Sequence, residues 1–212
     1  MSVYPPEVTE RHVGNPEQQI AGWVGATPPT QPIIVVDPDP AWPSWFSAEA
    51  ARIVELLGDI AIRIEHVGST SVPNLPAKPI IDIDLQVADS AAEDTYVPPL
   101  AQSGYRLILR EPWWNGHRML VGPDGRFNLH VFPVGTPEPL RHLLFRDWLR
   151  AHPDDRELYA SAKRELAEST TANPAAYNLA KNTVIDNIYE RIFSVPPASH
   201  PAWPQPDSGS SL

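Results

Sequence analysis

A pair of aspartates inside an apolar segment is the feature of this sequence best suited to chemistry. Asp82 and Asp84 are separated by one residue within the segment 80–87. Because side chains alternate along a strand, both carboxylates fall on one face and the intervening apolar residues on the other. Two adjacent carboxylates repel each other, and their burial is costly unless a cation or a proton intervenes. The pair therefore predicts a divalent-metal site. The alternative is a solvated edge strand, for which this segment is too apolar.

A short turn rich in hydroxyl groups, Gly68-Ser69-Thr70-Ser71, precedes the acidic segment. Backbone amides and hydroxyls in such a turn can cradle a phosphate, and glycine allows the backbone to approach it closely. The alternative is an ordinary turn without a ligand. Together with the two aspartates, the turn favours metal-assisted phosphoryl or nucleotidyl transfer, in which metal ions bridge phosphates and neutralise their charge.

The same residues resemble a known signature. Gly68-Ser69, followed after a spacer by Asp82-Ile83-Asp84, matches the pattern of the nucleotidyltransferase fold, and four longer segments are similar to the GrpB family, also called UPF0157: 64–73, 77–83, 129–131 and 144–153. The resemblance runs from about Ile33 to Ile192. It implies an α/β fold with a nucleotidyltransferase-like mixed sheet, without naming a substrate. The related domain also occurs fused to dephospho-coenzyme A kinases in some bacteria, which points to nucleotide or cofactor chemistry.

The resemblance also locates a departure from the nucleotidyltransferase pattern. These enzymes commonly take a third carboxylate from a neighbouring strand, where this sequence has Asn128 and His130 on one strand face. Imidazole is a poor ligand for magnesium but a good one for manganese or zinc. We therefore expect Asp82, Asp84 and His130 to bind magnesium or manganese, with zinc as a further candidate. The alternative for His130 is a histidine packed in the core.

Three cations are candidates for contact with the phosphates of a nucleoside triphosphate. Lys78 lies just before the acidic strand, and Arg118 lies near the start of another expected strand. Lys181 falls on the apolar stripe of a C-terminal helix, where a lysine either reaches into a polar cavity or extends to solvent. For Lys78 and Arg118, the alternative is an ordinary surface cation.

Composition limits the class of protein. The chain has 212 residues, with 16 Lys and Arg against 26 Asp and Glu, for a net charge of −10. This charge disfavours nucleic acid as a partner. Cysteine is absent, which excludes disulfides and thiolate metal sites. Without an apolar run of membrane-spanning length or a leader pattern, we expect a soluble cytoplasmic protein; the sequence does not predict its oligomeric state.

Proline is concentrated at both ends of the chain, which indicates one compact domain between two arms. We expect a Pro-rich arm over 1–32, a domain over 33–193 and a Pro/Ser-rich tail over 194–212. Both arms are expected to be extended or mobile, but Trp23 and Trp203 argue against complete disorder, because an aromatic residue in an arm often docks onto the domain. Within the domain, periodicity predicts strands at 33–36, 60–67, 80–87, 105–109, 117–121 and 127–134, and helices at 44–57, 91–103 (disturbed by Pro98-Pro99), 140–151, 154–167 and 174–193. This order predicts an α/β core with a helical C-terminal portion.

Three functions are compatible with these residues. The first is an enzyme that transfers a nucleotidyl group from a nucleoside triphosphate to a small-molecule acceptor, favoured by the intact aspartate pair. The second is a non-catalytic module that binds a nucleotide or phosphorylated metabolite, favoured by the missing third carboxylate. The third is a ligase that acts through an adenylylated intermediate. The acceptor and the base of the nucleotide cannot be read from the sequence.

Overall fold

A mixed five-stranded sheet forms the centre of the protein in a computed structural model, which describes residues 4–12, 14–25, 34–169 and 174–204, without the side chains of residues 168–180. The strands are β1 (Arg63–Val67), β2 (Ile81–Val87), β3 (Arg106–Glu111), β4 (His117–Val121) and β5 (Phe127–Pro133). The α-helices are α1 (Pro6–Thr9), α2 (Pro16–Ala21), α3 (Trp42–Leu57), α4 (Glu93–Gln102), α5 (Pro137–Ala151), α6 (Pro153–Ser169) and α7 (Pro174–Ser194). Short 3-10 turns occupy Gly58–Ile60, Ser69–Ser71, Pro123–Gly125 and Pro197–Ser199.

The strands lie in the order β1-β2-β5-β4-β3. Strand β2 pairs with β5 in parallel, and the other three pairings are antiparallel. The central position of β2 explains its apolar sequence, because a strand with neighbours on both sides and helices on both faces is largely buried. The mixed α/β fold expected from the sequence is therefore confirmed.

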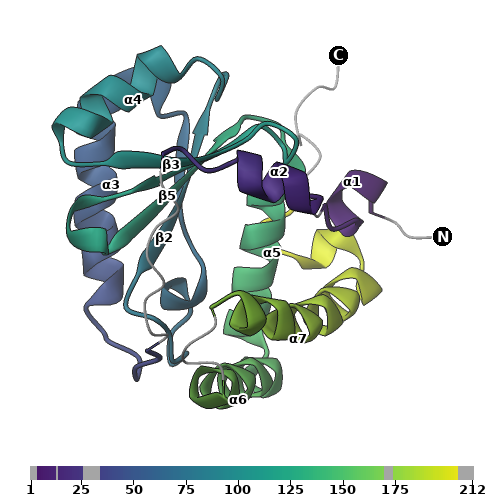
Figure 1. Cartoon of the computed structure of the whole chain (residues 1–212). Helices are drawn as coiled ribbons and strands as arrows, with labels where there is room; N and C mark the ends of the chain where they lie inside the picture. Colours follow the sequence, from purple (N-terminus) through teal and green to yellow (C-terminus); the bar gives the residue numbers. More distant parts are fainter. Residues whose placement is uncertain (1–3, 13, 26–33, 170–173, 205–212) are drawn as a thin grey trace.

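One face of the sheet packs against α3 and α4, which lie together on that side in Figure 1. Ile81, Ile83 and Leu85 of β2 point to this face and are fully buried. Helix α3 contributes Ile53 and Leu57 to the same core and ends at Gly58, whose φ of 53° favours glycine. The odd-numbered residues of β2 thus form the core, and alternation sends its aspartates to the opposite face.

The opposite face lies beneath α5 and the other C-terminal helices (Figure 1). Leu144 and Leu149 of α5 pack with Tyr159 of α6 and with Ile188 and Ile192 of α7, forming a second hydrophobic cluster. This confirms the expected helical C-terminal portion.

Both terminal arms pack against this second cluster where the structure describes them. Tyr4 and Val8 are buried in it, and the Tyr4 ring contacts that of Trp203 edge-on at 5.1 Å. Trp23 forms a bridge with Leu109 at the free edge of β3. Both tryptophans are docked. The described parts of the arms are thus packed rather than extended or mobile, and α1 and α2 give the N-terminal arm more regular structure than its prolines predicted.

Two local predictions differ from the structure. Residue Val36 forms only an isolated bridge with Ala77 rather than part of a strand, and Ile33 lies outside the described residues. Helix α4 continues through Pro98 and Pro99 to Gln102. Tyr96 and Leu100 on either side of the prolines are fully buried, so packing offsets an interior-proline cost of about 3 kcal/mol. Among the residues described, no helix has the length and apolar character needed to cross a membrane.

Candidate functional site

Strands β2 and β5 bring the predicted polar residues together. In their parallel register, Asp82 lies beside Asn128 and Asp84 beside His130. The Asn128 amide donates a hydrogen bond of 2.9 Å to Oδ1 of Asp82, and Nε2 of His130 lies 3.8 Å from the same oxygen. Two strands that are distant in sequence thus place an amide and an imidazole around one carboxylate, and His130 faces Asp82 rather than the apolar core.

Gly68 lies directly against Asp82. Its φ is 68° and its ψ −172°, a conformation that residues with a side chain rarely adopt, and a Cβ added there would lie 2.2 Å from Oδ2 of Asp82. The turn after it is held internally, because the Ser71 hydroxyl donates to the Gly68 carbonyl at 2.6 Å and the Thr70 hydroxyl to the Ile80 carbonyl at 3.2 Å. Thr70 and Ser71 are buried, so the parts of the turn that line the adjacent cavity are Gly68 and Ser69.

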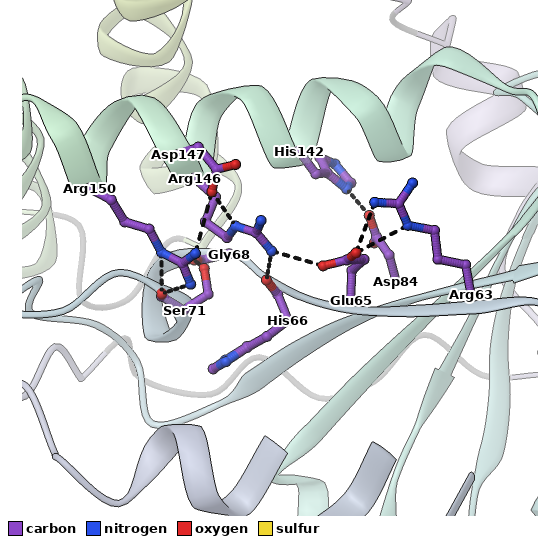
Figure 2. A network of polar contacts seen from close by, with 10 residues as sticks. All are labelled: Arg63, Glu65, His66, Gly68, Ser71, Asp84, His142, Arg146, Asp147 and Arg150. Atoms are coloured by element: carbon purple, nitrogen blue, oxygen red, sulfur yellow. Dashed lines mark hydrogen bonds and ion pairs between the residues drawn. The ribbon is translucent and has the colours of Figure 1, made fainter. Parts of the chain in front are cut away.

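Asp84 has a different environment from Asp82. It is only 1% exposed, and its Oδ2 accepts a hydrogen bond of 2.8 Å from Nδ1 of His142 on α5 (Figure 2). Burial opposes a positive charge on His142, but the negative charge of Asp84 outweighs this effect and raises the pKa of His142 to about 9. The other oxygen, Oδ1, is buried and has no hydrogen-bond partner within the described residues. Buried polar oxygens normally have a partner, which makes Oδ1 of Asp84 a candidate ligand for a cation.

The environment of Asp82 stabilises its charged form. Burial favours the protonated carboxyl, but the neighbouring His130 imidazole, the hydrogen bond from the Asn128 amide and the charge of Lys181 together lower the pKa of Asp82. The carboxylate is therefore ionised at neutral pH and is partly open to the cavity, with 29% of its side chain exposed.

A chain of hydrogen bonds from Glu111 through His117 orients the His130 ring. Glu111 Oε2 lies 2.7 Å from Nδ1 of His117, whose Nε2 lies 3.0 Å from Nδ1 of His130. Burial lowers the pKa of His117 far below its ordinary value, so this ring is neutral. With its Nδ1 proton donated to Glu111, Nε2 of His117 accepts from His130 Nδ1. The remaining nitrogen of His130 then points toward Asp82, as expected of a metal-binding histidine held by a second layer of residues.

A cavity of about 520 Å³ is lined by Asp82, whereas Asp84 and His130 are not among its lining residues. Its walls come from the N-terminal arm, the Gly68 turn, β2, the β3–β4 loop, α5, α6 and α7. The lining residues used below are Arg11, His12, Gly14, Gln19, Gly68, Ser69, Asp82, Glu111, Trp113, Arg141, His142, Arg146 and Lys181. This combination of cations, aromatic rings and a few carboxylates is typical of a small-molecule site.

The three predicted cations have different positions. Lys181 lines the cavity. Lys78 is half-buried, and burial followed by the charge of Lys181 lowers its pKa, while Asp82 raises it, so the three charges lie within electrostatic reach of one another. Arg118 lies on the opposite face of the sheet and pairs with Glu93 of α4 at 2.7 Å. The structure thus does not bring Arg118 to the site, because it alternates with Met119, the partner of His130.

Residues on α5 are functional candidates that the sequence analysis missed. Arg146 donates to Glu65 at 3.0 Å and to the His66 carbonyl at 3.1 Å, which ties α5 to β1 beside the Gly68 turn (Figure 2). The Arg150 side chain donates a hydrogen bond of 2.8 Å to the Ser71 carbonyl. In the sequence, the i, i+4 spacing of Arg146 and Arg150 on one helix face is the signal that indicates a shared target.

The donor set fits a divalent cation only in part. Asp82 and Oδ1 of Asp84 have the oxygen chemistry that magnesium and manganese prefer, and the free nitrogen of His130 is suited to manganese or zinc. Within the ranges described, however, no three His, Asp or Glu side chains are clustered as a finished metal site. A cation held here would therefore rest on two carboxylates, with the imidazole completing the set.

The mixed sheet places Asp82 and the Gly68 turn at a cavity and buries Asp84 beside it, which defines an α/β protein with a candidate small-molecule site. The family model described as "GrpB protein" matches residues 32–191, and the chain belongs to this family. A UPF0157 protein of Halalkalibacterium halodurans is 52% identical over 75% of this chain and 82% of its own length. The crystal structure of conserved protein GrpB from Enterococcus faecalis superposes with a TM-score of 0.69 at 34% identity, over 76% of this chain and 98% of that one. A dephospho-CoA kinase of Mycolicibacterium paratuberculosis is 33% identical over 76% of this chain and 46% of its own length.

Proposed function

We propose that this protein binds a nucleoside triphosphate with a divalent cation and transfers its nucleotidyl group to a small-molecule acceptor. The observation that carries the proposal is the contact between Gly68 and Asp82 at the floor of the cavity, which sets a phosphate-binding turn against an ionised carboxylate. The similarity to a dephospho-CoA kinase, a protein named for a nucleotide-type substrate, is in keeping with this class of ligand.

Each residue has a defined role in the proposed reaction. Asp82, Asp84 through Oδ1, and His130 hold the cation, which when bound neutralises phosphate charge. The Gly68 backbone and the Ser69 hydroxyl bind phosphate oxygens, and Lys181 offsets the charge of the leaving group. A nucleophilic group of the acceptor forms a bond to the α-phosphorus as the bond from that phosphorus to the bridging oxygen breaks, and pyrophosphate leaves.

A second candidate function is a non-catalytic module that binds the same nucleotide or a phosphorylated metabolite. One observation favours it: His142, with its pKa near 9, already supplies a positive charge to Asp84 at neutral pH. When a histidine of the protein neutralises one of the two carboxylates, the site needs less metal charge and is less suited to a two-metal reaction.

A thermal-shift experiment tests ligand binding for both candidates. The melting temperature is measured with each of the four common nucleoside triphosphates in the presence of magnesium, manganese or zinc. We expect stabilisation by a triphosphate that requires a divalent cation and is lost in the Asp82→Asn/Asp84→Asn double variant. Asp124→Asn is the matched control, because Asp124 is 77% exposed in a turn remote from the cavity.

Release of pyrophosphate separates the two candidates. Incubation of the protein with the stabilising triphosphate and a panel of small hydroxyl- and amine-bearing metabolites should release pyrophosphate in proportion to a nucleotidylated product. Binding without release for any acceptor favours the binding module. No stabilisation by any triphosphate contradicts nucleotidyl transfer and nucleotide binding alike.

A further inference from the structure

One wall of the cavity is built by residues to which the proposed reaction assigns no contact with phosphate or cation. His12, Gly14 and Gln19 of the N-terminal arm face the cavity together with Glu111 and Trp113. We call these five residues the arm wall. The three arm residues precede the family-matched range 32–191. The wall is connected to Asp82 through successive contacts of Glu111 with His117, of His117 with His130 and of His130 with that aspartate.

The arm is fixed in position by contacts along its whole described length. Arg11 pairs with Asp186 of α7 at 3.1 Å, and Arg141 of α5 donates to the Val8 carbonyl. The Gly22 carbonyl accepts from the backbone amide of Arg110 at 2.8 Å, which ties the end of the arm to β3. The arm is therefore a wall of the cavity and not a loose extension.

Trp113 supplies a flat apolar surface in this wall. Its indole ring lies so close to Gly14 that a Cβ there would come within 2.3 Å of a ring carbon, and the His12 ring lies 6.0 Å away at a tilt of 34°. The Gln19 side chain donates to the Gly14 carbonyl at 2.9 Å and holds the glycine in this place. The sequence thus keeps a glycine where the ring of Trp113 must be accommodated. Aromatic side chains that line a nucleotide site stack on bases.

Glu111 adds a hydrogen-bond acceptor beside this surface. Its Oε2 is occupied by His117, whereas Oε1 has no hydrogen-bond partner among the described residues. The carboxylate is half-buried. A carboxylate oxygen in such a place accepts from an amino group and repels a carbonyl oxygen.

We infer that the arm wall binds the base of the nucleotide, with the base stacked on Trp113 and its exocyclic amino group donating to Glu111. The inference rests on the proposed function and deepens it, because it states a preference for adenine or cytosine over the corresponding bases that carry a carbonyl oxygen. The N-terminal arm thereby takes part in base selection by holding Trp113 in place.

Two matched ligand pairs test the inference. Binding of ATP against inosine triphosphate, and of CTP against uridine triphosphate, is measured by calorimetry with the full chain and manganese; within each pair an amino group is replaced by a carbonyl oxygen. We expect the amino-bearing ligand to bind about tenfold more tightly in at least one pair, as for loss of a hydrogen bond to a charged group. The Glu111→Gln variant should lose most of this preference, and Glu55→Gln, at an exposed position on α3, should retain it. Equal affinities within both pairs, or an unchanged preference in Glu111→Gln, would overturn the inference.

Inorganic tripolyphosphate separates failure of the inference from failure of the proposed function. Trp113→Leu should weaken nucleoside triphosphate binding about tenfold through lost stacking and leave tripolyphosphate binding unchanged. Gly14→Ala, which displaces the ring without removing it, should act in the same direction, whereas Trp45→Leu, on α3 and outside the cavity lining, should not. If tripolyphosphate binds and Trp113→Leu has no effect on nucleotides, the base site is wrong and the phosphate site stands. If neither ligand binds, the proposed function fails.

Discussion

Replacement of Gly68 by alanine is the sharpest single test of the site. The substitution destabilises the folded state in two ways that can be distinguished in the structure. The first is backbone strain, because φ of 68° with ψ of −172° is unfavourable for alanine by about 1–3 kcal/mol. The second is steric, since the new Cβ would lie 2.2 Å from Oδ2 of Asp82 and would force that carboxylate away from Asn128. Loss of this hydrogen bond adds about 1 kcal/mol, at the low end for a charged group because Asp82 is partly exposed.

Gly58→Ala is a matched control for the backbone cost. Gly58 also has a positive φ, 53°, with ψ of −131°, but an added Cβ meets nothing within 4 Å. Urea unfolding of both variants should give similar slopes, with Gly68→Ala less stable than Gly58→Ala by about 1 kcal/mol. Thermal-shift measurements should show that triphosphate with manganese stabilises Gly58→Ala as it does the wild type and no longer stabilises Gly68→Ala. Equal stability of the two variants together with unchanged binding in Gly68→Ala would refute the proposed contact between turn and carboxylate.

Three further predictions concern charged side chains. Lys181→Met should leave the melting temperature nearly unchanged and weaken triphosphate binding measured by calorimetry, by about tenfold for one charge-assisted contact. Arg118→Gln should lower the free energy of unfolding in urea by about 1–3 kcal/mol through its lost contact with Glu93, without affecting triphosphate affinity. The ion pair between His142 and Asp84 should contribute fully below pH 6.5 and be lost as the pH rises through about 9, because folding raises the pKa of His142. The free energy of unfolding should therefore fall by roughly 3 kcal/mol over this interval, and His142→Gln should flatten the curve.

Local patterns in the sequence were sufficient to predict the elements of the core. Alternation within β2 placed both aspartates on the face opposite the core, and the glycine turn identified the backbone that meets Asp82. These features depend on neighbours in the chain, which is why they could be predicted without tertiary information. The same rule shows that His117 and Arg118 point to opposite faces, but only the contact of His117 with His130 in the structure shows which face belongs to the site.

Contacts made by α5 and the arm could not be predicted in this way. His142 meets Asp84 across 58 residues of sequence, and no periodicity in α5 distinguishes it from an exposed histidine. The need for glycine at position 14 cannot be predicted from the sequence either, because it arises from the indole ring of Trp113 that packs against this residue. Such residues are fixed by packing between elements, which depends on the angle and depth of the contact rather than on the sequence of either element.

The two aspartates, equivalent in the strand pattern, should respond differently to single substitutions. Asp84→Asn leaves the His142 imidazolium without its counter-charge in a largely buried place, which should lower the free energy of unfolding by about 3 kcal/mol near pH 7 and reduce the pH dependence between 6.5 and 9. Asp82→Asn removes a partly exposed carboxylate whose neighbours include an amide and the cavity, so it should change stability much less and abolish cation-dependent triphosphate binding. Urea unfolding at several pH values and calorimetry with manganese measure the two effects. Equal loss of stability in both variants would contradict the assignment of Asp84 to His142, and full triphosphate binding by Asp82→Asn would remove Asp82 from the ligand site.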